Sequence, residues 1–110
     1  MKKDKDRFAP YPPMGWNSWD CYMSAVTEAE LLENARYQAE HLLPYGWEYI
    51  TCDIQWYEPT AGTRPGCEYI PFAPLCMDGY GRLIPAENRF PSSAGGRALH
   101  PLRRSCTDWG

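Results

Sequence analysis

The sequence has no long hydrophobic run. Its basic start, residues 1–7, is followed by the proline-rich stretch 9–13, where a signal peptide needs a continuous apolar segment. We therefore expect no signal peptide, no membrane partner and a cytoplasmic location. The chain of 110 residues also has no basic stripe, because Lys and Arg cluster only in residues 1–7 and at 103–104. With a formal net charge of -3, a nucleic-acid partner is not expected.

The sequence also has no cysteine spacing that is typical of a shared site. Its five cysteines are an odd number and include no CxxC pair, which indicates neither a zinc site nor a closed disulfide framework. We expect mostly free thiols, although Cys67 and Cys76 flank a proline-rich stretch and would be able to pair in an exported protein. Ser-His-Asp, P-loop and dinucleotide-binding patterns are missing as well. We therefore expect no metal and no cofactor.

What the sequence does contain is a short α/β pattern. Residues 14–20 combine aromatic and small polar side chains and predict a short strand that runs into a loop. Thr27 and Glu30 have the spacing of a capping box, which marks the start of a helix. Apolar residues then recur at helical spacing, namely Leu31, Ala35, Ala39 and Leu42. Pro44 and Gly46 end this pattern, which predicts one amphipathic helix of about four turns.

A second strand is predicted over residues 47–54, which are rich in aromatic and β-branched side chains. We expect this strand to be buried on both faces. Strand, helix and strand form a βαβ unit with a parallel sheet. Two strands do not cover their own apolar faces, so more chain is expected around them. Residues 57–91 contain turn formers without periodicity and predict a long loop at the carboxyl ends of the strands, where ligands bind in such folds.

Three residues lie at or just past the ends of the predicted strands and are candidates for ligand contact: Trp19, Asp53 and Trp56. Asp53 either contacts a ligand or caps the amides of the next loop, because an acid at the end of an apolar strand needs a partner. Aromatic faces stack on sugar rings and carboxylates accept hydrogen bonds from sugar hydroxyls, although most tryptophans are core residues. His41, near the end of the predicted helix, is expected to be a surface histidine favoured by the helix dipole.

Five ordered motifs extend this pattern: Pro13-Met-Gly-Trp-Asn-Ser-Trp-Asp, Leu43-Pro-Tyr-Gly-Trp-Glu-Tyr, Cys52-Asp-Ile-Gln-Trp, Gly79-Tyr-Gly-Arg-Leu and Asn88-Arg-Phe-Pro. Together they resemble glycoside hydrolase family 27 over about residues 11–97. The resemblance implies an α/β fold, the N-terminal βαβ portion of a (β/α)8 TIM barrel truncated after the second strand and its long loop. It also implies a retaining exo-glycosidase acting on terminal α-galactosides through two carboxylates. Both carboxylates belong to later strands, so no catalytic residue is expected in this chain.

The resemblance also implies a sugar-binding wall made of Trp19, Asp53 and Ile54. Trp19 matches the tryptophan that packs against galactose, and Asp53 matches the first of two consecutive aspartates that hold its hydroxyls. Ile54 replaces the second aspartate and would leave a hydroxyl unpaired, at about 1–3 kcal/mol. Because L-arabinopyranose lacks the hydroxymethyl arm of galactose, Ile54 motivates an alternative β-L-arabinopyranosidase preference. Gln55 stands where the family usually has a cysteine, which puts the disulfide of exported members in doubt.

The end of the sequence departs from the family pattern. The resemblance predicts a helix after residue 96, but Pro101 interrupts it, and a one-base frame shift of the back-translated tail restores the expected continuation. We therefore expect a flexible N-terminal segment (residues 1–10), a barrel portion (11–97) and an aberrant, frameshifted tail (98–110). The alternative is a genuine short protein with a divergent C-terminus. As functions, a non-catalytic carbohydrate-binding remnant and a small disulfide-stapled secreted domain remain the competing interpretations.

Overall fold

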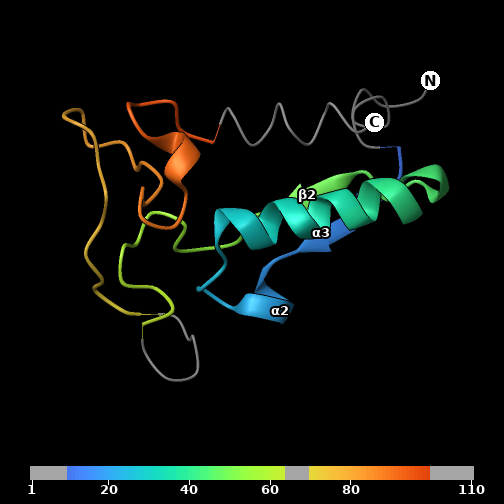
Figure 1. Cartoon of the computed structure of the whole chain (residues 1–110), viewed down its shortest axis with the longest axis horizontal. Coiled ribbons are helices and arrows are strands. Elements are labelled where there is room, and N and C mark those ends of the chain that lie inside the picture. Colours follow the sequence, from blue (N-terminus) through green and yellow to red (C-terminus); the bar gives the residue numbers. More distant parts are fainter. Residues whose placement is uncertain (1–9, 64–69, 100–110) are drawn as a thin grey trace.

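The computed structural model describes residues 10–63 and 70–99. The expectations for the N-terminal segment, for Cys67 and for the tail from residue 100 lie outside these residues. The elements along the chain are β1 (Gly15–Asn17), α2 (Trp19–Tyr22), α3 (Glu28–His41), the 3-10 helix η1 (Leu43–Tyr45), β2 (Tyr49–Thr51) and the 3-10 helix η2 (Pro91–Ser93). Figure 1 shows α3 lying over the two strands, with the long segment after β2 gathered at one end. None of the helices in the described ranges is long and apolar enough to cross a membrane.

The two strands form a parallel pair, which confirms the predicted βαβ unit. Gly15 is in register with Tyr49, and Asn17 with Thr51. Glycine is required at position 15 because a β-carbon there would collide with the carbonyl oxygen of Tyr49 and would lie 2.6 Å from the Cβ of Tyr49. The glycine of the first motif therefore permits the close approach of β1 to β2.

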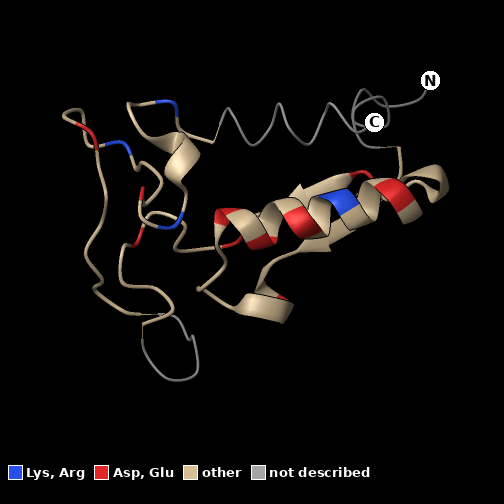
Figure 2. Cartoon of the chain, viewed as in Figure 1, with Lys and Arg blue, Asp and Glu red and all other residues tan. Residues whose placement is uncertain are grey.

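Helix α3 begins and ends as the sequence predicts. The Thr27 hydroxyl accepts a hydrogen bond from the Glu30 amide (3.4 Å), and the Glu30 carboxylate accepts one from the Thr27 amide (2.8 Å). This reciprocal capping box satisfies two amides that the first turn leaves unpaired. Acidic residues lie along α3 in Figure 2, and those of its first turn, Glu28 and Glu30, are favourably placed for the helix dipole. After η1, Gly46 adopts a left-handed conformation with φ 88° and turns the chain toward β2.

Two expectations about the strands are wrong. Residues 19–22 form the helical turn α2 instead of a loop, because Asn17 Oδ1 accepts a hydrogen bond from the Trp19 amide (2.8 Å) and starts the turn. A helix of 4 residues is too short to show a periodic pattern. Strand β2 has 3 residues instead of eight and is not buried on both faces. Tyr49 and Thr51 are exposed, since α3 covers one face and the described residues supply only two strands.

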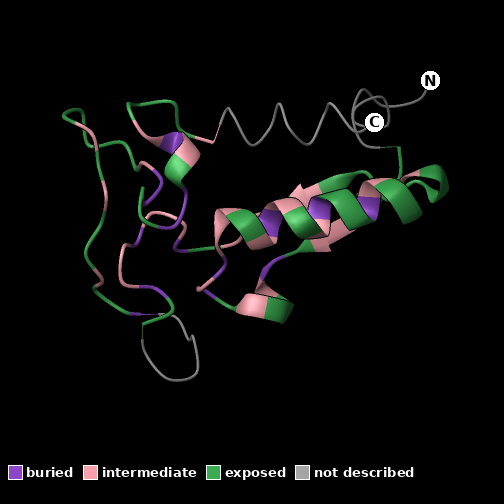
Figure 3. Ribbon diagram, in the orientation of Figure 1, coloured by how far each residue is buried: buried purple, intermediate pink, exposed green. Residues whose placement is uncertain are grey.

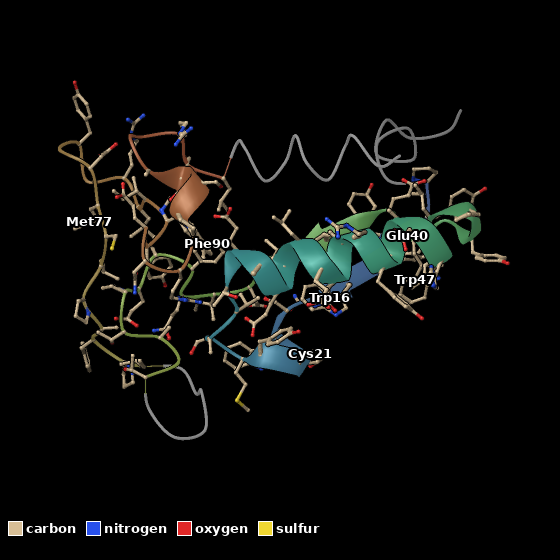
Figure 4. The ribbon with its side chains drawn as sticks, viewed as in Figure 1. Trp16, Cys21, Glu40, Trp47, Met77 and Phe90 are labelled. Atoms are coloured by element: carbon tan, nitrogen blue, oxygen red, sulfur yellow. The ribbon has the colours of Figure 1, made fainter. Side chains whose placement is uncertain are left out.

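The hydrophobic core lies where the first turn of α3 meets the end of the long loop. Its buried members are Val26, Leu31 and Phe90, and half-buried Trp16 and Ile50 from the strands pack against them. Figure 3 shows buried positions recurring along α3, and Figure 4 shows Phe90 between η2 and the start of α3. One core is therefore shared by the βαβ unit and the loop that follows it.

The long loop predicted over residues 57–91 is confirmed, since its described part holds only an isolated antiparallel bridge between Met77 and Leu83 before η2 begins. The turn at the tip of this hairpin is organised by Asp78, whose Oδ1 accepts hydrogen bonds from the amides of Tyr80 (2.9 Å) and Arg82 (3.0 Å). Hydrogen bonds from the Arg82 and Tyr80 amides help to lower the pKa of Asp78 below its usual range. Met77 lies far from the core in Figure 4.

Candidate functional site

Ser18 holds the carboxyl ends of the two strands together. Its amide donates to the Thr51 carbonyl (3.0 Å), which continues the β1–β2 pairing by one residue. Its hydroxyl oxygen accepts a hydrogen bond from the Asp53 amide (2.9 Å). Ser18 is fully buried, so water does not compete for these bonds. The segment after β1 and the segment after β2 are therefore fixed against each other at one edge of the sheet.

This edge carries the three residues predicted to bind sugar. Trp19 opens α2 directly after Ser18 and is half-buried, and Asp53 lies two residues beyond β2 and is half-buried. Ile54 follows with 40% of its surface exposed. A half-exposed indole, a half-exposed carboxylate and an exposed apolar side chain thus lie at the carboxyl edge of a parallel sheet, where such folds bind ligands. That combination suits a sugar ring, which has both hydroxyls and an apolar face.

Asp53 also caps its own loop. Its Oδ1 accepts a hydrogen bond from the Ile54 amide at 2.6 Å, which is the alternative role expected for a strand-end aspartate. The cap engages one carboxylate oxygen and fixes the orientation of the group. Capping and ligand contact are therefore compatible, because a carboxylate has two oxygens and several acceptor positions.

The structure separates the remaining candidates from this edge. Trp56 packs against the hydrophobic core and makes an edge-to-face contact with Tyr57, with ring centroids 5.2 Å apart. Trp56 is therefore a packing residue, as most tryptophans are. His41 is exposed at the last turn of α3, with its ring centroid 4.2 Å from that of Tyr37, and the expectation of a surface histidine is confirmed.

Sequence reasoning missed Arg89, the most connected side chain of the loop. Its guanidinium donates to four carbonyl oxygens, those of Gln55 (2.7 Å), Glu58 (3.0 Å), Ser24 (2.6 Å) and Val26 (2.7 Å). Only 6% of its surface is exposed, and burial lowers the pKa of Arg89 below its ordinary value, an effect that the neighbouring Cys52 and Glu58 oppose. The sequence feature that could have indicated this role is the position of the arginine in the motif Asn88-Arg-Phe-Pro, between apolar and turn-forming residues.

Gln55 was also missed as a structural residue. Its side-chain nitrogen donates to the Ile70 carbonyl (2.7 Å), and its side-chain oxygen accepts from the Ile70 amide (3.0 Å). Gln55 is buried and has a positive φ of 65°, an unusual conformation for a residue with a side chain. The side-chain amide of Gln55 thus bonds to both backbone groups of Ile70, as the backbone of a neighbouring strand would. It joins residue 55 to residue 70 without a covalent bond.

The described cysteines form no site. Cys21, Cys52 and Cys76 are free thiols, as expected. Burial raises the pKa of Cys52 to about 11, with the Arg89 charge lowering it and the Asp53 charge raising it by smaller amounts, so this thiol is inert at neutral pH. Within residues 10–63 and 70–99, no cluster of three His, Cys, Asp or Glu side chains is placed to hold a metal ion.

Comparison with known proteins gives consistent neighbours. The chain is 34% identical over 96 residues to the α-galactosidase mel1 of Schizosaccharomyces pombe, in a match covering 83% of this chain and 18% of that protein. It is 62% identical to a Bacillus halodurans C-125 protein to which α-N-acetylgalactosaminidase activity has been ascribed, with a TM-score of 0.80 over 90% of this chain and 22% of that one.

A third neighbour is a GH27 β-L-arabinopyranosidase from Geobacillus stearothermophilus, also solved with arabinose, which is 50% identical. The match covers 100% of this chain and 25% of that one, with a TM-score of 0.88. No family model matches the chain. The chain spans about a fifth of the length of the curated relatives it matches, 18% in each case.

Proposed function

This chain belongs to glycoside hydrolase family 27, and we propose that it supplies the sugar-binding wall of a retaining exo-glycosidase that acts on terminal α-galactosides. We place the two carboxylates of the retaining mechanism outside these residues, on later strands of a (β/α)8 barrel. In this proposal residues 11–97 are the opening βαβ portion of the barrel. Trp19 packs against the sugar ring and Asp53 accepts hydrogen bonds from its hydroxyls.

The observation that carries the proposal is the joining of Trp19 and Asp53 through Ser18. The two residues are 34 positions apart in the sequence, yet the bond from the Asp53 amide to the Ser18 hydroxyl (2.9 Å) holds Asp53 next to the residue before Trp19. Because Oδ1 of Asp53 is engaged by the Ile54 amide, we assign the contact with a sugar hydroxyl to Oδ2. The indole then offers its face to the apolar side of the same ring.

A second candidate substrate is a β-L-arabinopyranoside, and Ile54 is the observation that favours it. Its side chain is 40% exposed at the same edge as Asp53 and offers no hydrogen-bond acceptor. A sugar that carries a hydroxymethyl group would place a polar group near an apolar side chain, which weakens its binding. L-Arabinopyranose lacks that group. The 50% identity to a β-L-arabinopyranosidase supports the same choice.

The test begins with the coding locus, which is sequenced beyond residue 110, and with expression of the complete product. That protein is assayed with p-nitrophenyl α-galactoside, p-nitrophenyl β-L-arabinopyranoside and p-nitrophenyl α-N-acetylgalactosaminide. Hydrolysis of any of them with retained anomeric configuration supports the enzyme. If the locus encodes no further strands and the chain of 110 residues binds galactose or arabinose without hydrolysis, a carbohydrate-binding remnant replaces it.

The role of Ile54 is tested by Ile54→Asp, which restores the second carboxylate of the pair. We expect kcat/KM for the galactoside to rise relative to the arabinopyranoside by about tenfold, the effect of one newly paired hydroxyl. Ile54→Leu is the matched control, because it keeps an apolar side chain of the same volume, and it should leave the ratio unchanged. Equal or greater turnover of the galactoside by the unmodified protein rejects the arabinopyranoside preference.

A further inference from the structure

We propose that Arg89 is the positioning residue of the sugar site, the group that fixes the segment after Trp19 against the segment after Asp53. The inference rests on the proposed function for the sugar. The hydrogen bonds of Arg89 are seen in the structure and do not depend on that proposed function. Arg89 has no direct contact with a ligand in this proposal, and it acts through the two segments to which it is bonded.

The four acceptors of Arg89 come from two separate parts of the chain. One terminal nitrogen donates to the carbonyls of Ser24 (2.6 Å) and Val26 (2.7 Å), which follow α2. The other donates to the carbonyls of Gln55 (2.7 Å) and Glu58 (3.0 Å), which follow Asp53. The planar guanidinium therefore sets the distance between these two segments, because both terminal nitrogens belong to one rigid group.

Arg89 is itself held in place by its backbone. Its amide donates to the Ala86 carbonyl (2.9 Å), and its carbonyl accepts from the amide of Glu28 in the first turn of α3 (3.0 Å). The next residue, Phe90, is fully buried in the core. The backbone that carries the guanidinium is thus fixed to α3 and to the hydrophobic core.

The site segments are consequently held at two levels. At the sheet edge, the Ser18 hydroxyl accepts from the Asp53 amide (2.9 Å). Further out, Arg89 bonds to Ser24 and Val26 on one side and to Gln55 on the other. The stretch from Ser18 to Val26 contains Trp19, and the stretch from Asp53 to Gln55 contains both remaining sugar-binding candidates. Loss of this outer clamp, the four bonds of the Arg89 guanidinium, releases both walls of the site beyond the bond between Ser18 and Asp53.

Lysine does not replace arginine in this role. A lysine keeps the charge, but its three donors diverge from one nitrogen and do not bond to two carbonyls on each side. Arg89→Lys therefore removes the four-bond pattern and keeps the positive charge, so the two contributions are measured separately. Arg82→Lys is the matched control, because Arg82 is an exposed arginine that bonds only within its own hairpin tip, to Asp78 (2.7 Å).

The test uses the complete product of the coding locus and measures kcat and KM on the glycoside that it hydrolyses. For Arg89→Lys we expect kcat/KM to fall by about a hundredfold, the effect of misplacing a binding group by about 1 Å, with most of the loss in KM. Arg82→Lys should match the unmodified protein. If Arg89 only supports folding, fewer molecules are active and kcat falls, but KM stays unchanged, and this result overturns the proposal.

A second readout keeps the test independent of the sugar. Hydrogen exchange in the full chain of 110 residues should accelerate in both residues 18–26 and 53–58 of Arg89→Lys, and in neither segment of Arg82→Lys. Unchanged exchange in these segments overturns the clamp whatever the activity. If the unmodified product hydrolyses none of the three glycosides while exchange responds as expected, the proposed function fails and the clamp stands.

Discussion

The βαβ unit, residues 14–51, and the loop region, residues 52–63 and 70–99, hold their backbones in different ways. In the first, the strand ladder and α3 pair amides with carbonyls in a regular pattern. In the second, polar side chains do much of this work, with Arg89 bonded to four carbonyls and Gln55 to both backbone groups of Ile70. The comparison shows that a segment with little secondary structure is ordered when buried side chains replace the missing ladder.

The two ways differ in how they respond to substitution. A ladder has many equivalent bonds, so the loss of one bond or one cap removes a small part of the stability. A buried side chain that serves several backbone groups leaves all of them unpaired when it is removed, and each unpaired buried group costs about 1–3 kcal/mol. The loop region should therefore depend on a few polar side chains, whereas the loss of one bond within the ladder or α3 of the βαβ unit should have a smaller effect.

The largest expected effect is at Phe90, which belongs to the loop region but packs in the core of the βαβ unit. We expect Phe90→Ala to lower the free energy of unfolding by about 3–5 kcal/mol, the cost of a fully buried phenylalanine and the cavity it leaves. Urea denaturation followed by tryptophan fluorescence measures this change. If α3 keeps its helical circular dichroism while the loop region becomes protease-sensitive, the two regions are separable.

Phe72 provides the control for this experiment. Its side chain is fully exposed in the loop region, so Phe72→Ala should change the free energy of unfolding by less than about 0.5 kcal/mol. The two substitutions remove the same atoms. Equal effects would mean that the shared core does not join the regions, and the comparison would then have to be abandoned.

Gln55 gives an intermediate effect that is local to the loop region. Gln55→Ala removes both bonds to the Ile70 backbone and should lower the free energy of unfolding by about 1–3 kcal/mol. Hydrogen exchange of the Ile70 amide should accelerate in the same variant. Gln38→Ala is the control, because Gln38 is also buried but bonds to the carbonyls of Trp47 (3.0 Å) and Tyr49 (3.1 Å) in the βαβ unit. Faster exchange at Ile70 in both variants would contradict a local role.

Sequence reasoning reached the βαβ unit because its signals are local. The capping box at Thr27 and Glu30 and the stop at Pro44 each lie within a few residues of the boundary they set, and the structure has both. The extent of β2 was overestimated because an apolar run predicts a strand without saying how many neighbours cover it. The turn α2 starts where Asn17 Oδ1 accepts a hydrogen bond from the Trp19 amide, and four residues are too few to show a helical pattern in the sequence.

The site was found in part for a related reason. Trp19 and Asp53 follow strands, and parallel strands bring the residues beyond their carboxyl ends to one edge. Ser18, Gln55 and Arg89 act through partners 15 to 65 positions away in the sequence, and such pairings are not encoded by spacing. A buried arginine in a loop motif is recognisable only once the carbonyls around it are placed.

The smallest expected effect is at Thr27, within the regular region. Thr27→Ala removes the hydroxyl that accepts the Glu30 amide (3.4 Å) and should lower the free energy of unfolding by about 1 kcal/mol. The remaining bonds of α3 persist, and the Glu30 carboxylate still accepts from the backbone amide of residue 27, so the loss is confined to one cap. Thr63→Ala is the control in the same urea denaturation. Its hydroxyl donates to the Thr60 carbonyl (2.6 Å) at an exposed position, where water replaces the lost bond, so this change should be nearly neutral. If Thr27→Ala destabilises the chain more than Gln55→Ala does, regular hydrogen bonding is no more tolerant of substitution than side-chain clamping.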